Sequence, residues 1–236
     1  MALPYFYNNS ISCSTSSLLL NEENSKHIVQ VLRMQNKEQL QLTDGRGNLF
    51  TAEIIDNNKK KCSVEIIKIS CQPASINRIS IAISLIKNNS RFEWFLEKAT
   101  EIGVTEIIPL ICERTEKQHF RFERMQGILI SAMLQSQQTY LPVLHEPVKY
   151  EIYIERQKEN TGQKFIAHCE KAKGKNNLFT IPPFHHPTIL IGPEGDFSKS
   201  EIEAALANNF IPVTLGNTRL RTETAGIVAA TLLSNL

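Results

Sequence analysis

The fold is decided by the stretch Thr188-Ile-Leu-Ile-Gly-Pro-Glu-Gly-Asp-Phe-Ser198 and by a second one, Val213-Thr-Leu-Gly-Asn-Thr-Arg-Leu-Arg-Thr-Glu-Thr-Ala225. Each begins with a short apolar run, which is typical of a buried parallel strand, and passes through glycine into a helix start. Two such turns side by side present backbone N–H groups and open space at one edge of a sheet, where small ligands bind. The sequence therefore predicts a ligand site at adjacent strand ends of an α/β sheet.

Both turns carry signals for the helix that follows. Ser198 with Glu201 three residues later forms a capping box, which predicts a helix start. Thr222 or Thr224 is expected to cap the final helix. Residues 225–233 of that helix are apolar or small nearly all round, which is typical of a buried helix.

Charged residues in the second turn favour a functional site. Gly-Pro-x-Gly alone is also an ordinary β-turn sequence. In the second turn, however, Arg219 and Arg221 flank Leu220, and Glu223 follows at once. Charge placed between a core strand and an apolar helix costs stability unless the groups are paired or used, so we expect a role for these side chains.

Together these motifs resemble those of a known family. Ile191-Gly-Pro-Glu-Gly195, Leu215-Gly216 and Leu220-Arg-Thr-Glu-Thr-Ala225 look like the signature of the RsmE family. Its members are SPOUT-class methyltransferases that use S-adenosyl-L-methionine to methylate N3 of a specific uridine in 16S ribosomal RNA. The resemblance implies a SPOUT-type parallel sheet with a C-terminal trefoil knot, preceded by a small PUA-like β-barrel domain. It also implies a homodimer, with 16S rRNA in the 30S subunit as partner.

The expected site residues follow from these motifs and their neighbours. His168 is included because it stands at the C-terminal end of a predicted strand, 165–169. The residues expected to bind the cofactor are His168, Gly192, Pro193, Glu194, Gly195, Leu215, Gly216, Leu220, Arg221 and Thr222. No metal ligands are expected, because no His pair at helical spacing has an acidic partner.

The implied reaction and its RNA substrate suggest candidate catalytic and RNA-binding residues. Before methylation, uracil N3 must lose a proton, which a carboxylate could accept or a cation could favour. Glu223 and Arg221 are the candidates for these roles. The cations expected to contact RNA are Arg33, Lys87, Lys98 and Arg114, although each also fits an ordinary solvated surface charge.

The chain divides into two predicted domains. Residues 1–72 read as mostly β, with strands near 39–42, 49–55 and 62–69 and a hairpin turn at Asp44-Gly45. We expect them to form the PUA-like RNA-binding barrel. Proline at 73 cannot continue a strand ladder, so the boundary is placed there, and residues 73–236 form the methyltransferase domain.

The second domain begins with a parallel crossover. Residues 78–85 alternate as a strand, 92–102 recur at helical spacing with Gly103 as the stop, and 106–112 form the next strand. A further helix is predicted over residues 124–137. Strand, helix and parallel strand in this order indicate an α/β domain.

Composition limits the classes that remain. The 236 residues are 42% hydrophobic and carry a net charge of only +2. An RNA-binding surface must therefore be a local cluster of basic residues rather than the whole protein. The candidate clusters are Lys59–Lys61, 114–124 and 171–175. The five cysteines are widely spaced and no apolar run approaches a membrane span, which favours a reducing cytoplasm and no membrane contact. Walker, Gly-x-Gly-x-x-Gly and Gly-x-Ser-x-Gly motifs are absent, which disfavours ATPases, dehydrogenases and hydrolases.

Three positions depart from the family pattern. Lys37-Glu38 stands where Gly-Asp is common, and the usual early Arg is missing near Tyr5. The family usually has an Arg two or three residues after Gln135-Ser136, where this chain has Gln138 and Thr139. Two alternatives therefore stay open: another SPOUT activity such as ribose 2′-O-methylation, and an RNA-binding protein without catalysis. Binding of S-adenosyl-L-methionine would separate the enzymes from the last.

Overall fold

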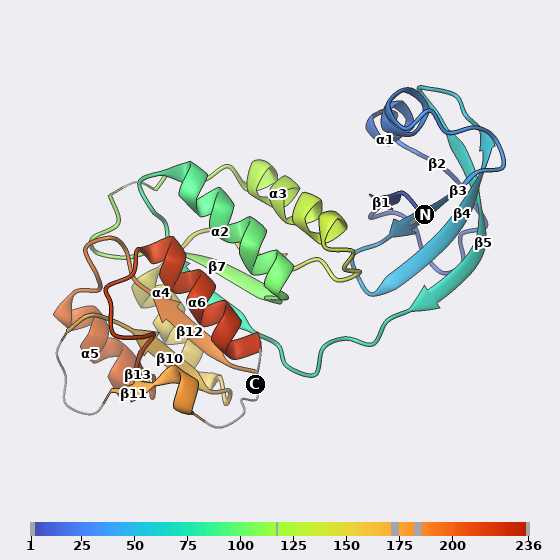
Figure 1. Cartoon of the computed structure of the whole chain (residues 1–236). Coiled ribbons are helices and arrows are strands. Elements are labelled where there is room, and N and C mark those ends of the chain that lie inside the picture. Colours follow the sequence, from blue (N-terminus) through green and yellow to red (C-terminus); the bar gives the residue numbers. More distant parts are fainter. Residues whose placement is uncertain (1–2, 117, 171–174, 182–185, 235–236) are drawn as a thin grey trace. The chain divides into compact units, whose positions relative to one another are not determined.

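The computed structural model of the chain describes residues 3–116, 118–170, 175–181 and 186–234 (Figure 1). The chain folds into two compact units, Met1–Ala74 with Met133–Leu141, and Ser75–Ala132 with Pro142–Leu236. Within the described ranges, no helix is long and apolar enough to cross a membrane.

The first unit is built on a five-stranded sheet in the order β1-β3-β4-β5-β2. Its strands are β1 (Tyr5–Tyr7), β2 (Ser17–Leu19), β3 (Gln39–Thr43), β4 (Asn48–Asp56) and β5 (Ser63–Cys71). The predicted hairpin joins β3 and β4 in antiparallel register, with Gly45 at φ +72°. Helical structure begins at α1 (Glu22–Lys26), where the Asn21 side chain caps the N-terminus. It continues through a π-helical turn (His27–Val31).

A segment from later in the chain, residues 138–141, completes this unit. The Tyr5 hydroxyl donates to the Gln138 carbonyl at 2.8 Å, and the Gly47 amide donates to the Thr139 carbonyl at 2.9 Å. Gly47 has φ +97°, and a Cβ there would lie 2.3 Å from the Tyr140 hydroxyl oxygen. The first unit is therefore discontinuous in sequence, and the backbone of β1 and the β3–β4 hairpin forms its receiving surface.

The second unit is a parallel sheet, as expected. The strand order is β11-β13-β10-β12-β6-β7-β8, with β9 beside β7, and every pairing is parallel. The strands are β6 (Ser80–Ser84), β7 (Glu106–Ile111), β8 (Val143–Leu144), β9 (Val148–Lys149), β10 (Lys164–Ala167), β11 (Asn176–Asn177), β12 (Thr188–Ile191) and β13 (Ile211–Thr214). Residues 81–84 of β6 are buried on both faces of the sheet, as in sheets covered by helices on both sides.

Helices cover both faces of this sheet. On one face, α2 (Asn89–Ile102) packs against α6 (Thr222–Ser234), and α6 contacts β6 and β12. On the other, α4 (Tyr150–Arg156) and α5 (Lys199–Ala207) share an apolar cluster with Ile166 and Leu190. The Arg124 guanidinium of α3 (Phe122–Gln135) pairs with Glu93 of α2 at 2.6 Å. The mixed α/β architecture is confirmed (Figure 1).

The observed helix ends can be compared with the predicted helix starts and stops. The capping box is confirmed, because the Ser198 amide donates to Glu201 Oε2 at 2.8 Å and the Glu201 amide donates to Ser198 Oγ at 3.3 Å. Gly103 ends α2 at φ +98°, as expected. The expected cap at Thr222 or Thr224 is wrong, because both residues lie inside α6. The Thr222 hydroxyl donates to the Gly192 carbonyl.

Two expectations about the C-terminal region need correction. The α6 helix is only partly buried, since Ile227 and Val228 remain half-exposed while Ala229 and Ala230 are fully covered. The strands before the two glycine turns, β12 and β13, are also not neighbours. The intervening strand is β10, which pairs with both, so its C-terminal end lies between the two turns.

The close approach of α6 to α2 depends on Gly226. A Cβ at this position would lie 2.6 Å from Phe95 Cε2 and 3.0 Å from Ile83 Cδ1. We predict that Gly226→Ala lowers the free energy of unfolding by about 1–3 kcal/mol despite alanine's better helix propensity, because the core is overpacked. Gly127 in α3 has nothing within 4 Å of its ideal Cβ. Gly127→Ala is the control and should raise the free energy of unfolding by about 0.5–1 kcal/mol. Denaturant titration measures both, and equal effects of the two substitutions would contradict the packing argument.

Candidate functional site

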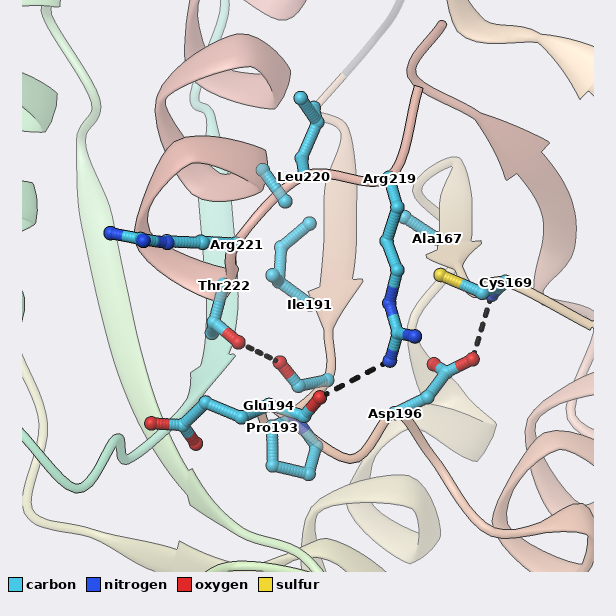
Figure 2. A pocket seen from close by; sticks show the side chains of 12 residues that line it. Ala167, Cys169, Ile191, Pro193, Glu194, Asp196, Arg219, Leu220, Arg221 and Thr222 are labelled. Carbon is cyan, nitrogen blue, oxygen red and sulfur yellow. Dashed lines mark hydrogen bonds between the residues drawn. The ribbon is translucent and has the colours of Figure 1, made fainter. Parts of the chain in front are cut away.

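A cavity of about 280 Å³ opens at the C-terminal ends of β10 and β12 (Figure 2). Its size is close to the lower limit for small-molecule sites. It is lined by Ala167, Cys169, Ile191, Gly192, Pro193, Glu194, Asp196, Arg219, Leu220, Arg221, Thr222 and Ala225. Six of the ten residues expected to bind a cofactor are among them; His168, Gly195, Leu215 and Gly216 are not.

The first turn depends on glycine for its own packing. A Cβ on Gly192 would lie 3.0 Å from the Phe197 ring and 3.2 Å from the Phe197 amide nitrogen. Asp196 adopts φ +65°, and its carboxylate accepts hydrogen bonds from the amides of Phe197 at 2.9 Å and Cys169 at 2.7 Å. Asp196 thereby ties the turn after β12 to the end of β10 and closes one side of the cavity (Figure 2).

Two of the residues expected to contact RNA hold this turn. The Arg114 guanidinium donates to the Gly195 carbonyl at 2.7 Å, and the Lys87 amide donates to Glu194 Oε1 at 3.0 Å. The Lys87 ammonium pairs with Glu116 at 2.8 Å, and this partner raises the pKa of the lysine. These contacts give Arg114 and Lys87 a structural explanation that the sequence did not indicate.

The other two expected RNA contacts, Lys98 and Arg33, do not line the cavity. Lys98 pairs with Glu97 at 2.8 Å and Glu101 at 2.9 Å on the surface of α2. Arg33 belongs to the first unit, where it is exposed. The four cations are therefore divided between the two units.

The second turn joins the first through Thr222. Its hydroxyl is buried and donates to the Gly192 carbonyl at 2.9 Å. Arg219 extends toward the first turn and reaches the Glu194 carbonyl at 3.4 Å, whereas Arg221 extends in a different direction from the same segment (Figure 2). Arg221 is exposed, so its charge is solvated in the single chain.

The two candidate catalytic groups occupy different environments. Glu223 is buried, with 8% of its side chain exposed, and its carboxylate lies 3.7 Å from the Arg91 guanidinium of α2. It is not part of the cavity lining, whereas Arg221 is. Glu223 therefore supports the α2–α6 contact, and Arg221 alone of this pair borders the cavity.

His168 has an unusual environment for a polar side chain. It is 9% exposed, and neither ring nitrogen has a hydrogen-bond partner among the residues that the structure describes. The residues on either side of it, Ala167 and Cys169, line the cavity. Burial lowers the pKa of His168, and the nearby positive charge of Lys175 lowers it further. The imidazole is therefore held in its neutral form.

The cavity also contains residues that sequence reasoning missed. Ala167 and Cys169 come from the end of β10, and Asp196 and Ala225 stand inside the quoted motifs without having been singled out. A role was expected for Arg219, but it was not among the residues expected to bind the cofactor. The signal for β10 was its position as a short apolar strand in a parallel sheet, whose C-terminal end belongs to the ligand-binding edge. The strand order that places it between the two turns could not be read from periodicity.

Burial of neutral His168 predicts a pH dependence of stability. Its pKa is depressed in the folded state, so the unfolded state binds a proton more readily. The free energy of unfolding should fall as pH decreases below the ordinary histidine pKa of 6.5. We predict that His168→Leu flattens this decrease between about pH 7 and pH 5. Thermal unfolding across this range measures it. His119→Gln, at an exposed position, is the control, and an unchanged slope in His168→Leu would contradict the prediction.

Both parts of the chain match known protein families. Residues 72–234 match a family model described as an RNA methyltransferase domain. Residues 20–67 match one described as an RNA methyltransferase PUA domain. The first match contains every residue of the cavity, and the second falls within the five-stranded sheet unit.

Individual relatives agree over nearly the whole chain. The ribosomal RNA small subunit methyltransferase E of Rickettsia conorii is 30% identical over 94% of this chain and 91% of its own length. A crystal structure of an rRNA-methyltransferase from Porphyromonas gingivalis superposes with a TM-score of 0.88 and 40% identity, covering 97% of this chain and 95% of that one. That of ribosomal RNA small subunit methyltransferase E from Neisseria gonorrhoeae, bound to S-adenosyl methionine, gives 0.86 and 28%, covering 99% and 98%. The resemblance of the glycine-turn motifs is confirmed, and the chain belongs to the RsmE family of ribosomal RNA small subunit methyltransferases.

Proposed function

We propose that the protein uses S-adenosyl-L-methionine to methylate N3 of a specific uridine in 16S ribosomal RNA, the position numbered 1498 in that RNA. The observation that carries the proposal is the cavity between the two family-signature turns, at the C-terminal edge of a parallel sheet. Ribose 2′-O-methylation, the alternative among enzymes, has no feature of this cavity in its favour.

The cavity suits the proposed cofactor. Ile191, Leu220 and Ala225 offer apolar surface for an adenine ring, and the backbone of 192–196 offers polar groups beside it. The Asp196 carboxylate and the Arg219 guanidinium extend from opposite sides of the cavity (Figure 2) and match a ligand with both charged and apolar parts. The cofactor would supply a methyl group on a sulfonium, so the protein has only to bind and align the reactants.

The protein's contribution to the reaction concerns the acceptor. The N3 proton of uracil has a pKa roughly like that of tyrosine, so the ring must be stabilised as it loses the proton. We assign this role to Arg221, which lines the cavity. Glu223 is the weaker candidate for a base, because its carboxylate already faces Arg91 at 3.7 Å.

A second subunit would complete this site. Arg221 is exposed and Ile227 and Val228 of α6 are half-exposed in the single chain. A homodimer that covers α6 would desolvate both. We therefore propose a homodimer with a C-terminal trefoil knot, acting in the cytoplasm on 16S rRNA within the 30S subunit. Residues 1–72 would grip RNA as a PUA-like domain, and residues 73–236 would carry the SPOUT methyltransferase activity.

The cofactor assignment is tested at Ala225, which lines the cavity from the first turn of α6. We predict that Ala225→Leu weakens binding of S-adenosyl-L-methionine by about tenfold or more, since about 1.4 kcal/mol corresponds to tenfold. The added side chain occupies part of the cavity. Isothermal titration calorimetry measures the affinity, and Ala225→Ser is the control with little added volume. Wild-type affinity in a folded Leu variant would place the cofactor elsewhere.

The reaction is tested by its product and by Arg221. Mass spectrometry of digested small-subunit RNA should find 3-methyluridine, and 2′-O-methyl nucleotides instead would overturn the assignment. Arg221→Lys keeps the charge but loses the planar fork. We predict a decrease in kcat of about ten- to a thousand-fold, the range for one electrostatic contact, with little change in cofactor affinity. Raising the pH should partly restore the rate. Wild-type turnover in this variant would remove Arg221 from the mechanism.

A further inference from the structure

Two turns of the first unit concentrate positive charge at one place. Residues 33–38 connect the first helical segment to β3, and residues 56–61 connect β4 to β5. These twelve residues contain Arg33, Lys37 and Lys59–Lys61 against Glu38 and Asp56. Their net charge of +3 exceeds the +2 of the whole chain, so the remaining residues are close to neutral.

Hydrogen bonds hold the two turns together. The Asn57 amide donates to Asn36 Oδ1 at 2.9 Å, and the Asn57 side chain donates to the Met34 carbonyl at 3.4 Å. The Lys37 amide donates to the Ile54 carbonyl at 2.8 Å. The turns therefore form one preorganised surface, which we name the paired-turn surface (residues 33–38 and 56–61).

The backbone of this surface is strained at two of its cations. Arg33 has φ +56° and Lys37 has φ +72°, a region that L side chains other than Asn and Asp rarely adopt. Glycine would adopt either conformation at lower cost. Backbone strain of this kind persists at sites where the side chain has a function. The strain therefore indicates a function for the positive charges of Arg33 and Lys37.

The charges are also available. All five cationic side chains of the paired-turn surface are exposed, and none forms an ion pair within the described residues. Of the two acidic residues, Glu38 already accepts a hydrogen bond from the Gln35 amide at 2.7 Å. The surface contains no aromatic residue that could stack on a base. Its chemistry therefore fits phosphate groups rather than stacked bases.

We propose that the paired-turn surface binds the sugar-phosphate backbone of the RNA substrate, with Lys37 and Lys59–Lys61 as phosphate contacts and Asn57 as the positioning residue. This inference rests on the proposed function, which supplies RNA as the partner. It gives sequence-independent affinity to the first unit and leaves recognition of the target base to the cavity.

The first experiment measures the affinity for transcribed 16S rRNA as a function of salt. Replacing Lys59, Lys60 and Lys61 together with Gln should make the slope of log affinity against log salt shallower by about 2–3, since each phosphate contact contributes about 0.7–0.9. Lys37→Gln should make it shallower by about 1. Lys68→Gln is the matched control, because Lys68 is exposed in the same unit but outside the paired-turn surface. Equal slopes in all variants would overturn the proposal.

A second experiment uses the strain at Lys37 to separate binding from folding. Lys37→Gly removes both the charge and the left-handed strain, so Tm should not fall while RNA affinity decreases about threefold or more at moderate salt. Asn57→Ala keeps every charge but loosens the turns, and it should weaken RNA binding with an unchanged salt slope. Loss of RNA binding only in variants that also lose Tm would assign these residues a structural role and overturn the proposal.

The outcome is distinguishable from failure of the proposed function. If wild-type protein binds 16S rRNA through this surface but forms no 3-methyluridine, the proposed reaction fails and the surface stands. If the triple lysine variant methylates 16S rRNA with wild-type KM and salt dependence, the surface fails and the reaction stands. If the triple lysine variant binds anionic vesicles more weakly than the wild-type protein but binds RNA with unchanged affinity, the surface belongs to a lipid partner. That result would also overturn the proposal.

Discussion

The hydrogen bond from the Thr222 hydroxyl to the Gly192 carbonyl is the contact on which the candidate site depends. It joins two turns that follow strands separated by β10, so the end of β10 is enclosed between them. A buried hydroxyl and carbonyl that lost each other would cost about 1–3 kcal/mol, because neither could reach water. The same contact makes Thr222 the first residue of α6 rather than its cap, which explains why a helix-start signal was misread. Local stability and cavity shape are therefore set by one bond between distant parts of the chain.

The positions that depart from the family pattern have structural explanations of their own. Tyr5 and Gln138 lie in segments where that pattern has arginines, and here the Tyr5 hydroxyl binds the Gln138 carbonyl at 2.8 Å. Burial raises the pKa of Tyr5, so the hydroxyl stays a donor. Lys37 stands where glycine is common, and its φ of +72° shows why glycine suits that position. The Gln138 acceptor is a backbone carbonyl, so the contact depends on Tyr5 and not on the side chain at 138. At Lys37, by contrast, the chain accepts backbone strain while keeping a cation.

How far the sequence predicts the structure depends on the range of each signal. The capping box at Ser198 and the stop at Gly103 are local, and both were read correctly. The parallel class followed from the strand–helix–strand pattern, because only a crossover joins parallel strands. Strand order was not predictable, since a buried parallel strand such as β10 has the same apolar pattern wherever it lies in the sheet. The roles of Arg114 and of residues 138–141 were also not predicted. In sequence, a cation or polar loop that forms hydrogen bonds with the backbone looks the same as one that is solvated.

The separation of Arg221 from Glu223 argues for a division of labour at the start of α6. Adjacent helical residues do not share a face, so side chains two apart point in different directions. Glu223 is turned inward to Arg91 of α2, and the Arg221 side chain is directed to solvent at the rim of the cavity. The ion pair between Glu223 and the partly exposed Arg91 links α6 to α2, and α6 carries Thr222 and the backbone next to Arg221. Solvent screening weakens the electrostatic interaction between an exposed guanidinium and a substrate. A strong interaction therefore requires that water be excluded from the rim of the cavity. The half-exposed apolar residues of α6 offer the surface on which a second subunit could do so.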